Sequence, residues 1–258
     1  MPPTILGGNS HASTSIFTLS LPCQLTLTNY YLLLKNNQLL MRKLMLESWL
    51  SLLQEYRVIA VIRADNFEVG KKMAHTAIMA GIKLIEVTWN SFQPERLIVY
   101  LRNQFPDCYV GAGTILHFED LQMALNAQAQ FIFSPHFNQD LVTFAHSNDI
   151  PFIPGTFSPT EIIKAFEGGA KVVKIFPVQA VGGVNYVKSL QGPMAQFPLI
   201  PTGGIKMSET IDFIQAGAIA VGLSTDLFPP HLILSEQWEI MGDRISQLQK
   251  QLVINKLQ

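Results

Sequence analysis

Short runs of apolar and β-branched residues alternate along this chain with longer stretches in which apolar residues recur every three or four positions. The short runs are Val58–Arg63, Lys83–Thr88, Tyr109–Thr114, Phe131–Ser134, Phe152–Pro154, Val172–Phe176, Leu199–Pro201 and Ala218–Gly222. The helical patterns between them are Glu68–Ala80, Pro94–Asn103, Phe118–Ala127, Asn138–Ser147, Pro159–Glu167 and Ser208–Ala216. Strands that alternate with helices predict parallel βα units. Eight such units favour an α/β fold with a single (β/α)8 TIM barrel over an open doubly wound sheet.

The two ends of the chain differ from this repeating part. Residues 1–43 contain prolines, glycines and scattered Ser, Thr and Asn residues with no clear period. We expect them to form a poorly ordered leader, or to lie upstream of a functional start near Met41; an organelle targeting peptide is the alternative. The TIM-barrel domain is expected to span 44–258. It begins with a helix at Leu44–Glu55 and ends with a helix within Ile233–Leu257.

Composition narrows the class of protein. The 258 residues are 48% hydrophobic and 14% charged, so the chain can bury a large core and differs from disordered proteins. A net charge of −1 gives no general attraction to nucleic acid or anionic lipid, and no long uninterrupted apolar run predicts a membrane span. Cys23 and Cys108 fit neither a disulfide framework nor a zinc site. We therefore expect a cytoplasmic protein with no metal or other cofactor and no nucleic acid or membrane partner.

Two ionisable residues lie inside strand-like runs, where a charge is costly to bury. They are Lys174, in Val172–Phe176, and Glu86, in Lys83–Thr88. If both face the interior of a barrel, an apolar environment would lower the pKa of the lysine, which could then form a Schiff base with a carbonyl group. A buried carboxylate beside it could transfer protons. The alternative for each is a side chain that faces outward or is held in a salt bridge.

Further polar residues and glycines end the predicted strands, where barrels place their catalytic and binding groups. Arg63 could hold a carboxylate or phosphate, or form a surface salt bridge. Thr114 could bind a substrate oxygen, with Gly111 and Gly113 allowing close approach, or it could cap a turn. The last two strands end in Thr202, Gly203, Gly204, Ser224 and Thr225. Barrels often bind phosphate there, because glycines let backbone N–H groups approach an anion.

Six motifs follow one another in a characteristic order. They are Leu84–Thr88, Gly111–Thr114, Phe133–His136, Pro154–Gly155, Val173–Pro177 and Pro201–Ile205. On these motifs the chain closely resembles the 2-keto-3-deoxy-6-phosphogluconate (KDPG) aldolase family, over about residues 45–250. Members of this family often also cleave 4-hydroxy-2-oxoglutarate (KHG).

The resemblance implies a class I aldolase on a TIM barrel, commonly a homotrimer, which cleaves a small keto acid without a metal. Its expected reaction converts KDPG to pyruvate and glyceraldehyde 3-phosphate, the aldolase step of the Entner-Doudoroff pathway. The resemblance implies that Lys174 forms the Schiff base and that Glu86 is the general acid or base. Thr114 and Pro135 match residues that line the pyruvate pocket. Gly203, Gly204 and the hydroxyl residues after the eighth strand match the phosphate site.

The chain departs from the family pattern at two places. Many members have an arginine four residues after the glutamate, where this chain has Asn90, so we expect Arg63 to anchor the carboxylate instead. A Gly-Ser pair is common after the eighth strand, where this chain has Ser224 and Thr225. These differences leave two alternatives. One is an aldolase that prefers KHG or another unphosphorylated 2-keto acid, and the other is a phosphate-binding barrel without covalent chemistry.

Overall fold

The computed structural model describes residues 49–256, and the predicted leader at 1–43 lies outside the described residues. The described part of the first helix spans residues 49–56. The strands that follow are β1 (Val58–Ile62), β2 (Leu84–Thr88), β3 (Tyr109–Gly113), β4 (Ile132–Phe133), β5 (Phe152–Ile153), β6 (Gly155–Thr156), β7 (Val173–Ile175), β8 (Leu199–Pro201) and β9 (Val221–Leu223). The helices between and after them are α2 (Phe67–Met79), α3 (Pro94–Gln104), α4 (Phe118–Asn126), α5 (Gln139–Ser147), α6 (Pro159–Glu167), α7 (Gly183–Met194), α8 (Thr210–Gln215), α9 (Pro230–Leu234) and α10 (Trp238–Lys256). Two short 3-10 helices, η1 (Val178–Val181) and η2 (Met207–Glu209), precede α7 and α8.

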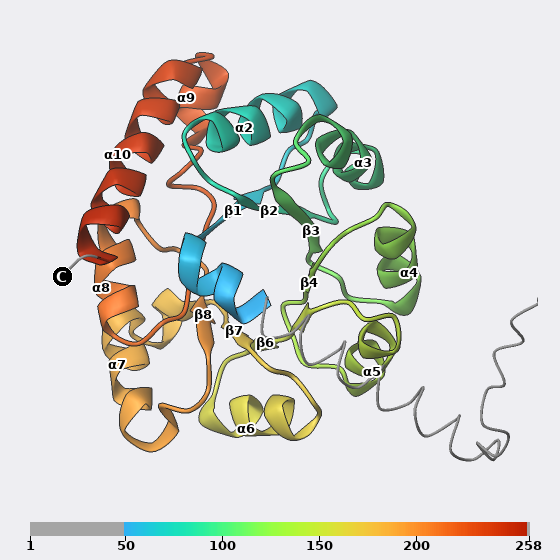
Figure 1. The fold of residues 1–258 in the computed structure, drawn as a ribbon, viewed down its shortest axis with the longest axis vertical. Helices are drawn as coiled ribbons and strands as arrows, with labels where there is room; N and C mark the ends of the chain where they lie inside the picture. Colours follow the sequence, from blue (N-terminus) through green and yellow to red (C-terminus); the bar gives the residue numbers. More distant parts are fainter. Residues whose placement is uncertain (1–48, 257–258) are drawn as a thin grey trace, which may run out of the picture. The chain divides into compact units, whose positions relative to one another are not determined.

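The strands pair in parallel as a curled sheet. Six of them are ordered β5-β4-β3-β2-β1-β9, and three more are ordered β6-β7-β8. Between β5 and β6 lies Pro154, which has no N–H to donate, although its carbonyl still accepts from Lys174 N at 2.8 Å. At the other junction, Thr202 forms a parallel bridge with Gly222, and Ile219 N donates to Leu199 O. The chain therefore has the predicted α/β architecture with parallel strands (Figure 1).

Local sequence signals begin the helices at the expected places. Asn66 caps α2, because its side chain accepts hydrogen bonds from the backbone N–H groups of Glu68 and Val69. Asn138 caps α5 in the same way, and Ser158 caps α6, which begins at Pro159. None of the helices among residues 49–256 combines the length and the apolar character that a membrane span requires.

Two parts of the prediction need correction. The helical segment expected within Ile233–Leu257 is two helices, α9 and α10, and the first of them already begins at Pro230. The sequence analysis also assigned no helix between the sixth and seventh strands, where α7 lies. This helix begins at Gly183 and contains Pro193, two residues that weaken a helical pattern in the sequence.

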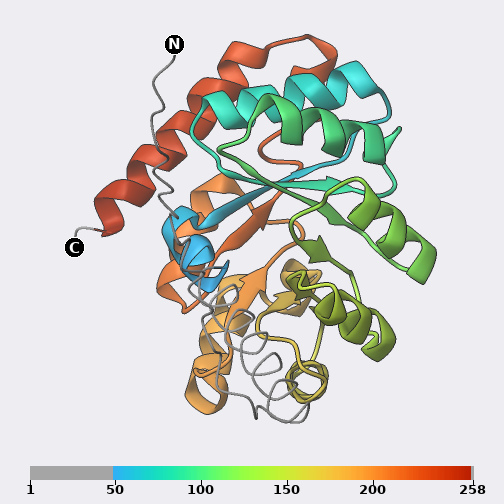
Figure 2. The ribbon, with the colours of Figure 1, turned by 45° about the vertical axis from the view of Figure 1, so that its right-hand side comes forward.

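Successive side chains along each strand point to opposite faces of the sheet, so the buried residues form two hydrophobic cores, one on each face. Side chains such as Ile59, Leu84 and Phe131 point to the inner side of the curled sheet, while their neighbours in sequence pack against the surrounding helices. The helix at residues 49–56 contributes Trp49 and Leu53 to the inner core, and the Trp49 ring lies 4.8 Å from that of Phe131. This helix lies at the amino ends of the strands (Figure 2), which leaves their carboxyl ends open for a site.

Candidate active site

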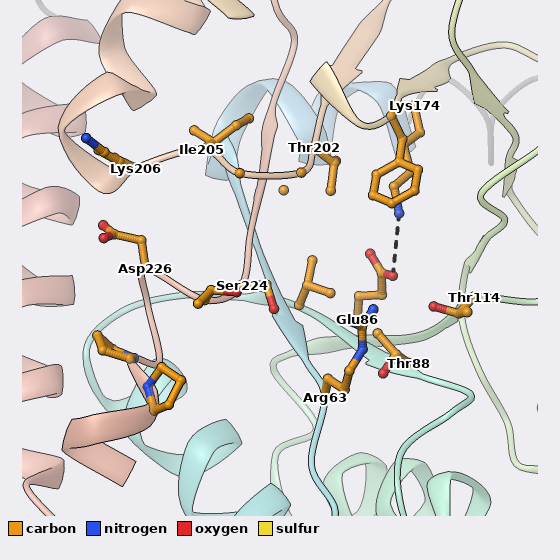
Figure 3. A pocket seen from close by; sticks show the side chains of 18 of the residues that line it. Arg63, Glu86, Thr88, Thr114, Lys174, Thr202, Ile205, Lys206, Ser224 and Asp226 are labelled. Carbon is orange, nitrogen blue, oxygen red and sulfur yellow. Dashed lines mark ion pairs between the residues drawn. The ribbon is translucent and has the colours of Figure 1, made fainter. Parts of the chain in front are cut away.

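One cavity of about 990 Å³ lies at the carboxyl ends of the strands (Figure 3). All ten residues predicted to form the site line it: Arg63, Glu86, Thr114, Pro135, Lys174, Thr202, Gly203, Gly204, Ser224 and Thr225. They come from loops and strands spread over more than half of the chain. These residues were selected because they follow the predicted strands, where barrels place their catalytic groups, and they do lie around one cavity.

Lys174 and Glu86 face each other inside this cavity. Their side chains are only 6% and 2% exposed, and Lys174 Nζ lies 4.0 Å from Glu86 Oε1. Both belong to the inward-facing set, because Val172 and Leu84, two residues earlier on the same strands, are in the inner core. The prediction that these side chains could face outward is therefore wrong for both residues. The alternative of a salt bridge is confirmed, because the two residues form an ion pair with each other.

The pair has few other polar contacts. Glu86 Oε1 has no hydrogen-bond partner in the described part of the chain. Lys174 Nζ lies 4.8 Å from the ring centroid of Phe176 and 5.6 Å from that of Phe133, so aromatic faces surround the amine. Phe176 also lines the cavity. An amine and a carboxylate held in this environment can react with a ligand that enters the cavity.

Burial is the main influence on the Glu86 carboxyl. It raises the pKa of Glu86 above the ordinary value, and the positive charges of Lys174 and Arg63 partly oppose this shift. A carboxyl group whose pKa is raised holds a proton more readily than an ordinary carboxyl group and can pass it to a neighbouring base. The electrostatics therefore suit Glu86 to proton transfer.

Gly113 is required for this arrangement. A Cβ atom at this position would lie 2.6 Å from Glu86 Cγ and closer still to the carboxylate. The preceding glycine, Gly111, makes room for the Phe131 ring in the same way. The sequence predicts that the two glycines allow a substrate to approach closely. In the structure their missing side chains leave room for two neighbouring side chains, those of Phe131 and Glu86.

Arg63 projects from the end of β1 and is exposed at the cavity. Among residues 49–256 it forms no ion pair within 4.0 Å, so the surface salt bridge considered as its alternative is absent there. The next residue, Ala64, donates its backbone N–H to the buried hydroxyl of Ser91 at 3.2 Å, and that hydroxyl also contacts Thr88 Oγ1 at 3.1 Å. These bonds fix the loop that bears Arg63 to the turn after β2.

Thr114 and Pro135 line the same cavity as Lys174. Thr114 has a φ of +60°, a left-handed conformation that is uncommon for a β-branched residue and marks local strain. Such strain is found at ligand sites more often than elsewhere, which agrees with its selection from the sequence.

The other end of the cavity is formed by the loops after β8 and β9. Gly203 and Gly204 have φ values of +98° and +80°, which favour glycine, and Thr202 is bridged to the neighbouring strand. Ser224 and Thr225 also line the cavity. The sequence analysis missed four charged or titratable residues of this end: Lys206, Asp226, His231 and Arg244. They lie beyond the strand ends or on α9 and α10, where no sequence signal distinguishes them from surface residues.

Comparison with known proteins agrees with this geometry. The model of the family "KDPG and KHG aldolase" matches residues 50–245. The chain belongs to this family. It is 32% identical to the 2-dehydro-3-deoxy-phosphogluconate aldolase of Haemophilus influenzae, over 76% of this chain and 92% of the relative. It is 30% identical to the KHG/KDPG aldolase of Escherichia coli K12, over 79% of this chain and 93% of the relative.

A solved aldolase structure resembles the fold closely. The KDPG aldolase of Legionella pneumophila, crystallised with pyruvate captured as a covalent carbinolamine intermediate, superposes with a TM-score of 0.71. The two chains are 27% identical, and the match covers 76% of this chain and 95% of the other. The family match and the structural match therefore indicate the same group of aldolases.

Proposed function

We propose that this chain is a class I aldolase that cleaves KDPG to pyruvate and glyceraldehyde 3-phosphate through a Schiff base on Lys174. The observation on which the proposal rests is the buried pair of Lys174 and Glu86, 4.0 Å apart at the base of an open cavity. Membership of the KDPG and KHG aldolase family supports the same reaction.

The proposed mechanism uses the amine of Lys174 as nucleophile. It attacks the C2 keto carbon, and loss of water from the carbinolamine gives an iminium ion. A base removes the proton of the C4 hydroxyl, the C3–C4 bond breaks, and its electron pair moves into the iminium to form an enamine while the aldehyde leaves. Protonation of the enamine at C3 and hydrolysis of the resulting iminium release pyruvate and free Lys174. Glu86 is the group placed to move these protons, because no other carboxylate of the described residues lies within 4.0 Å of Lys174 Nζ.

The remaining residues of the cavity divide between the two ends of the substrate. At the Lys174 end, Arg63 binds the C1 carboxylate, with Thr114 and Pro135 beside the three carbons that become pyruvate. At the other end, the phosphate lies among the Thr202–Gly204 loop and the hydroxyl groups of Ser224 and Thr225. In Figure 3, Arg63 and Thr114 lie beside Glu86, and Ser224 lies on the opposite side of Glu86 from Thr114, which supports this division.

The wider assignments are part of the same proposal. We propose that the six-stranded and three-stranded sheets form one (β/α)8 barrel, which is supported by the hydrogen bond from Lys174 N to Pro154 O and by the parallel bridge between Thr202 and Gly222. The barrel domain begins near residue 44 and is preceded by the leader at 1–43. We further propose that the enzyme is a cytoplasmic homotrimer whose partner is the small keto acid.

Preference for KHG or another unphosphorylated 2-keto acid is the second candidate. The name of the E. coli relative, KHG/KDPG aldolase, supports it, as does Ser224 in place of the usual glycine, which could crowd a phosphate. The third candidate, a phosphate-binding barrel without covalent chemistry, is disfavoured because it gives no reason to bury Lys174 against Glu86. Rates measured with KDPG and with KHG distinguish the first two candidates.

The decisive experiment traps the Schiff base. The protein is incubated with pyruvate and borohydride, and its intact mass is then measured. We expect a reduced pyruvate adduct in the natural protein and in Lys171→Ala, which removes an exposed lysine of the same segment, but not in Lys174→Ala. An unmodified natural protein, or an adduct that persists in Lys174→Ala, would contradict the proposed mechanism.

A further inference from the structure

The cavity continues past Ser224 into a region rich in charge. Lys206 and Arg244 line this region together with one carboxylate, that of Asp226, which contacts Arg244. In Figure 3, Lys206 and Asp226 lie on the side of the cavity opposite Lys174 and Glu86. The part of the cavity farthest from the reacting carbon thus has more basic than acidic side chains and is complementary to an anion.

Asp226 joins three elements at this end. Its Oδ2 atom accepts a hydrogen bond from the backbone N–H of Met207 at 2.8 Å, at the start of η2 after the Gly203–Lys206 loop. The same oxygen lies 3.5 Å from Arg244 Nη2 on α10. One carboxylate therefore ties the loop after β9 to the loop after β8 and to the last helix.

Arg244 remains available to a ligand. Its side chain is 33% exposed, and Asp226 is its one ion-pair partner in the range 49–256. A guanidinium group has five N–H donors, so contact through one nitrogen leaves donors for a second anion. Planar guanidinium groups bind phosphate well because two parallel hydrogen bonds can form. The contact with Asp226 limits the number of positions that the long side chain can take.

We propose that Arg244 determines specificity by binding the terminal phosphate of the substrate, and that Asp226 is the positioning residue that holds Arg244 and the Gly203–Lys206 loop around that phosphate. The inference rests on the proposed aldolase function and deepens it. It assigns the preference for a phosphorylated substrate to a side chain of the C-terminal helix, in addition to the glycine loop and the hydroxyl groups.

The test is aldol addition of pyruvate to two aldehydes that differ only in phosphate, glyceraldehyde 3-phosphate and glyceraldehyde. The measured quantity is the ratio of the two kcat/KM values. Loss of a charge-assisted hydrogen bond in Arg244→Met should lower this ratio by about tenfold or more, through KM for the phosphorylated aldehyde. The KM for pyruvate and the rate with glyceraldehyde should not change. Lys250→Met removes an exposed positive charge from the same helix outside the cavity and should leave the ratio unchanged.

Asp226 is tested in the same assay. Asp226→Ala should also lower the ratio, whereas Asp226→Asn should restore part of it, because an amide oxygen can still accept from Met207 N. A ratio that rises in Asp226→Ala would mean that the carboxylate repels the phosphate, and it would overturn the positioning role. Equal ratios in Arg244→Met and Lys250→Met would overturn the role of Arg244. If the natural protein forms no pyruvate adduct with borohydride, the proposed aldolase function is wrong. If the adduct forms, the ratios test only the roles of Arg244 and Asp226.

Discussion

Replacement of Gly113 by alanine should displace the carboxylate of Glu86, which we propose transfers protons, without unfolding the protein. Gly113 lies in β3 and does not have a positive φ, so its backbone conformation suits alanine. The obstacle is the added methyl group, which would lie 2.6 Å from Glu86 Cγ, whereas ordinary contacts begin near 3.4 Å. Glu86 is enclosed by the cavity wall and Lys174, so its carboxylate must be displaced for the methyl group to fit.

The size of the effect follows from that displacement. The Glu86 side chain has to move by about 1 Å, and a misplacement of this size in a catalytic group costs about 100-fold in rate. The estimate agrees with the contribution of general acid–base catalysis, which is about 100-fold to 10,000-fold. We therefore expect kcat/KM for KDPG cleavage to fall by about 100-fold, equivalent to about 2.7 kcal/mol in the activation barrier.

The assay couples pyruvate release to lactate dehydrogenase. The matched control is Gly192→Ala in α7, where an added Cβ meets nothing within 4 Å. A circular dichroism melt checks that both variants fold, and borohydride trapping with pyruvate checks that Lys174 still reacts. If Gly113→Ala kept the kcat/KM of the Gly192→Ala control, the position of the Glu86 carboxylate would not matter to catalysis and the reasoning would be refuted.

Four further outcomes can be measured. Burial raises the pKa of Glu86 in the folded state, so the stabilisation due to this carboxyl group is complete below its unfolded pKa and is lost as pH rises through its folded pKa. The free energy of unfolding in urea, measured across pH, should show this loss in the natural protein and not in Glu86→Gln. Trp49→Ala empties a buried site against Phe131 and should lower the free energy of unfolding in urea by about 3–5 kcal/mol. Arg63→Ala should raise KM for the keto acid by about tenfold or more, and an unchanged KM would exclude its role as carboxylate anchor. A chain that starts at Met41 should retain the kcat/KM of the full chain, whereas loss of activity would place the leader within the functional fold.

The orientation of the Lys174 and Glu86 side chains could be anticipated because strands have a fixed period of two. Each lies at the centre of a short strand, and residues two positions away point the same way, so the inward face of the strand follows from its apolar neighbours. What the sequence did not determine is that the two side chains meet. That depends on where β2 and β7 stand around the curled sheet, which is a property of the whole fold.

The end of the cavity that contains Asp226 and Arg244 could not be predicted from the sequence for the same reason. Asp226 and Arg244 lie in different elements, and their contact forms only when α10 packs against the loops after β8 and β9. Each residue alone has the appearance of an ordinary surface charge. A helical pattern also cannot locate the break between α9 and α10, because apolar residues continue through both helices.

The glycines of β3 explain why a short motif is so informative about this fold. Gly111 and Gly113 occupy inward positions next to two large groups from neighbouring strands, the ring of Phe131 and the carboxylate of Glu86. The inner space of the sheet is limited, so a bulky side chain on one strand requires a small residue on the strand beside it. The sequence Gly-Ala-Gly-Thr is therefore fixed by its neighbours as much as by a ligand. A methyl group at Gly113 would meet the Glu86 side chain, whereas a methyl group at Gly111 would meet both the ring and the backbone carbonyl oxygen of Phe131, so a smaller side chain at position 131 would not make room for it.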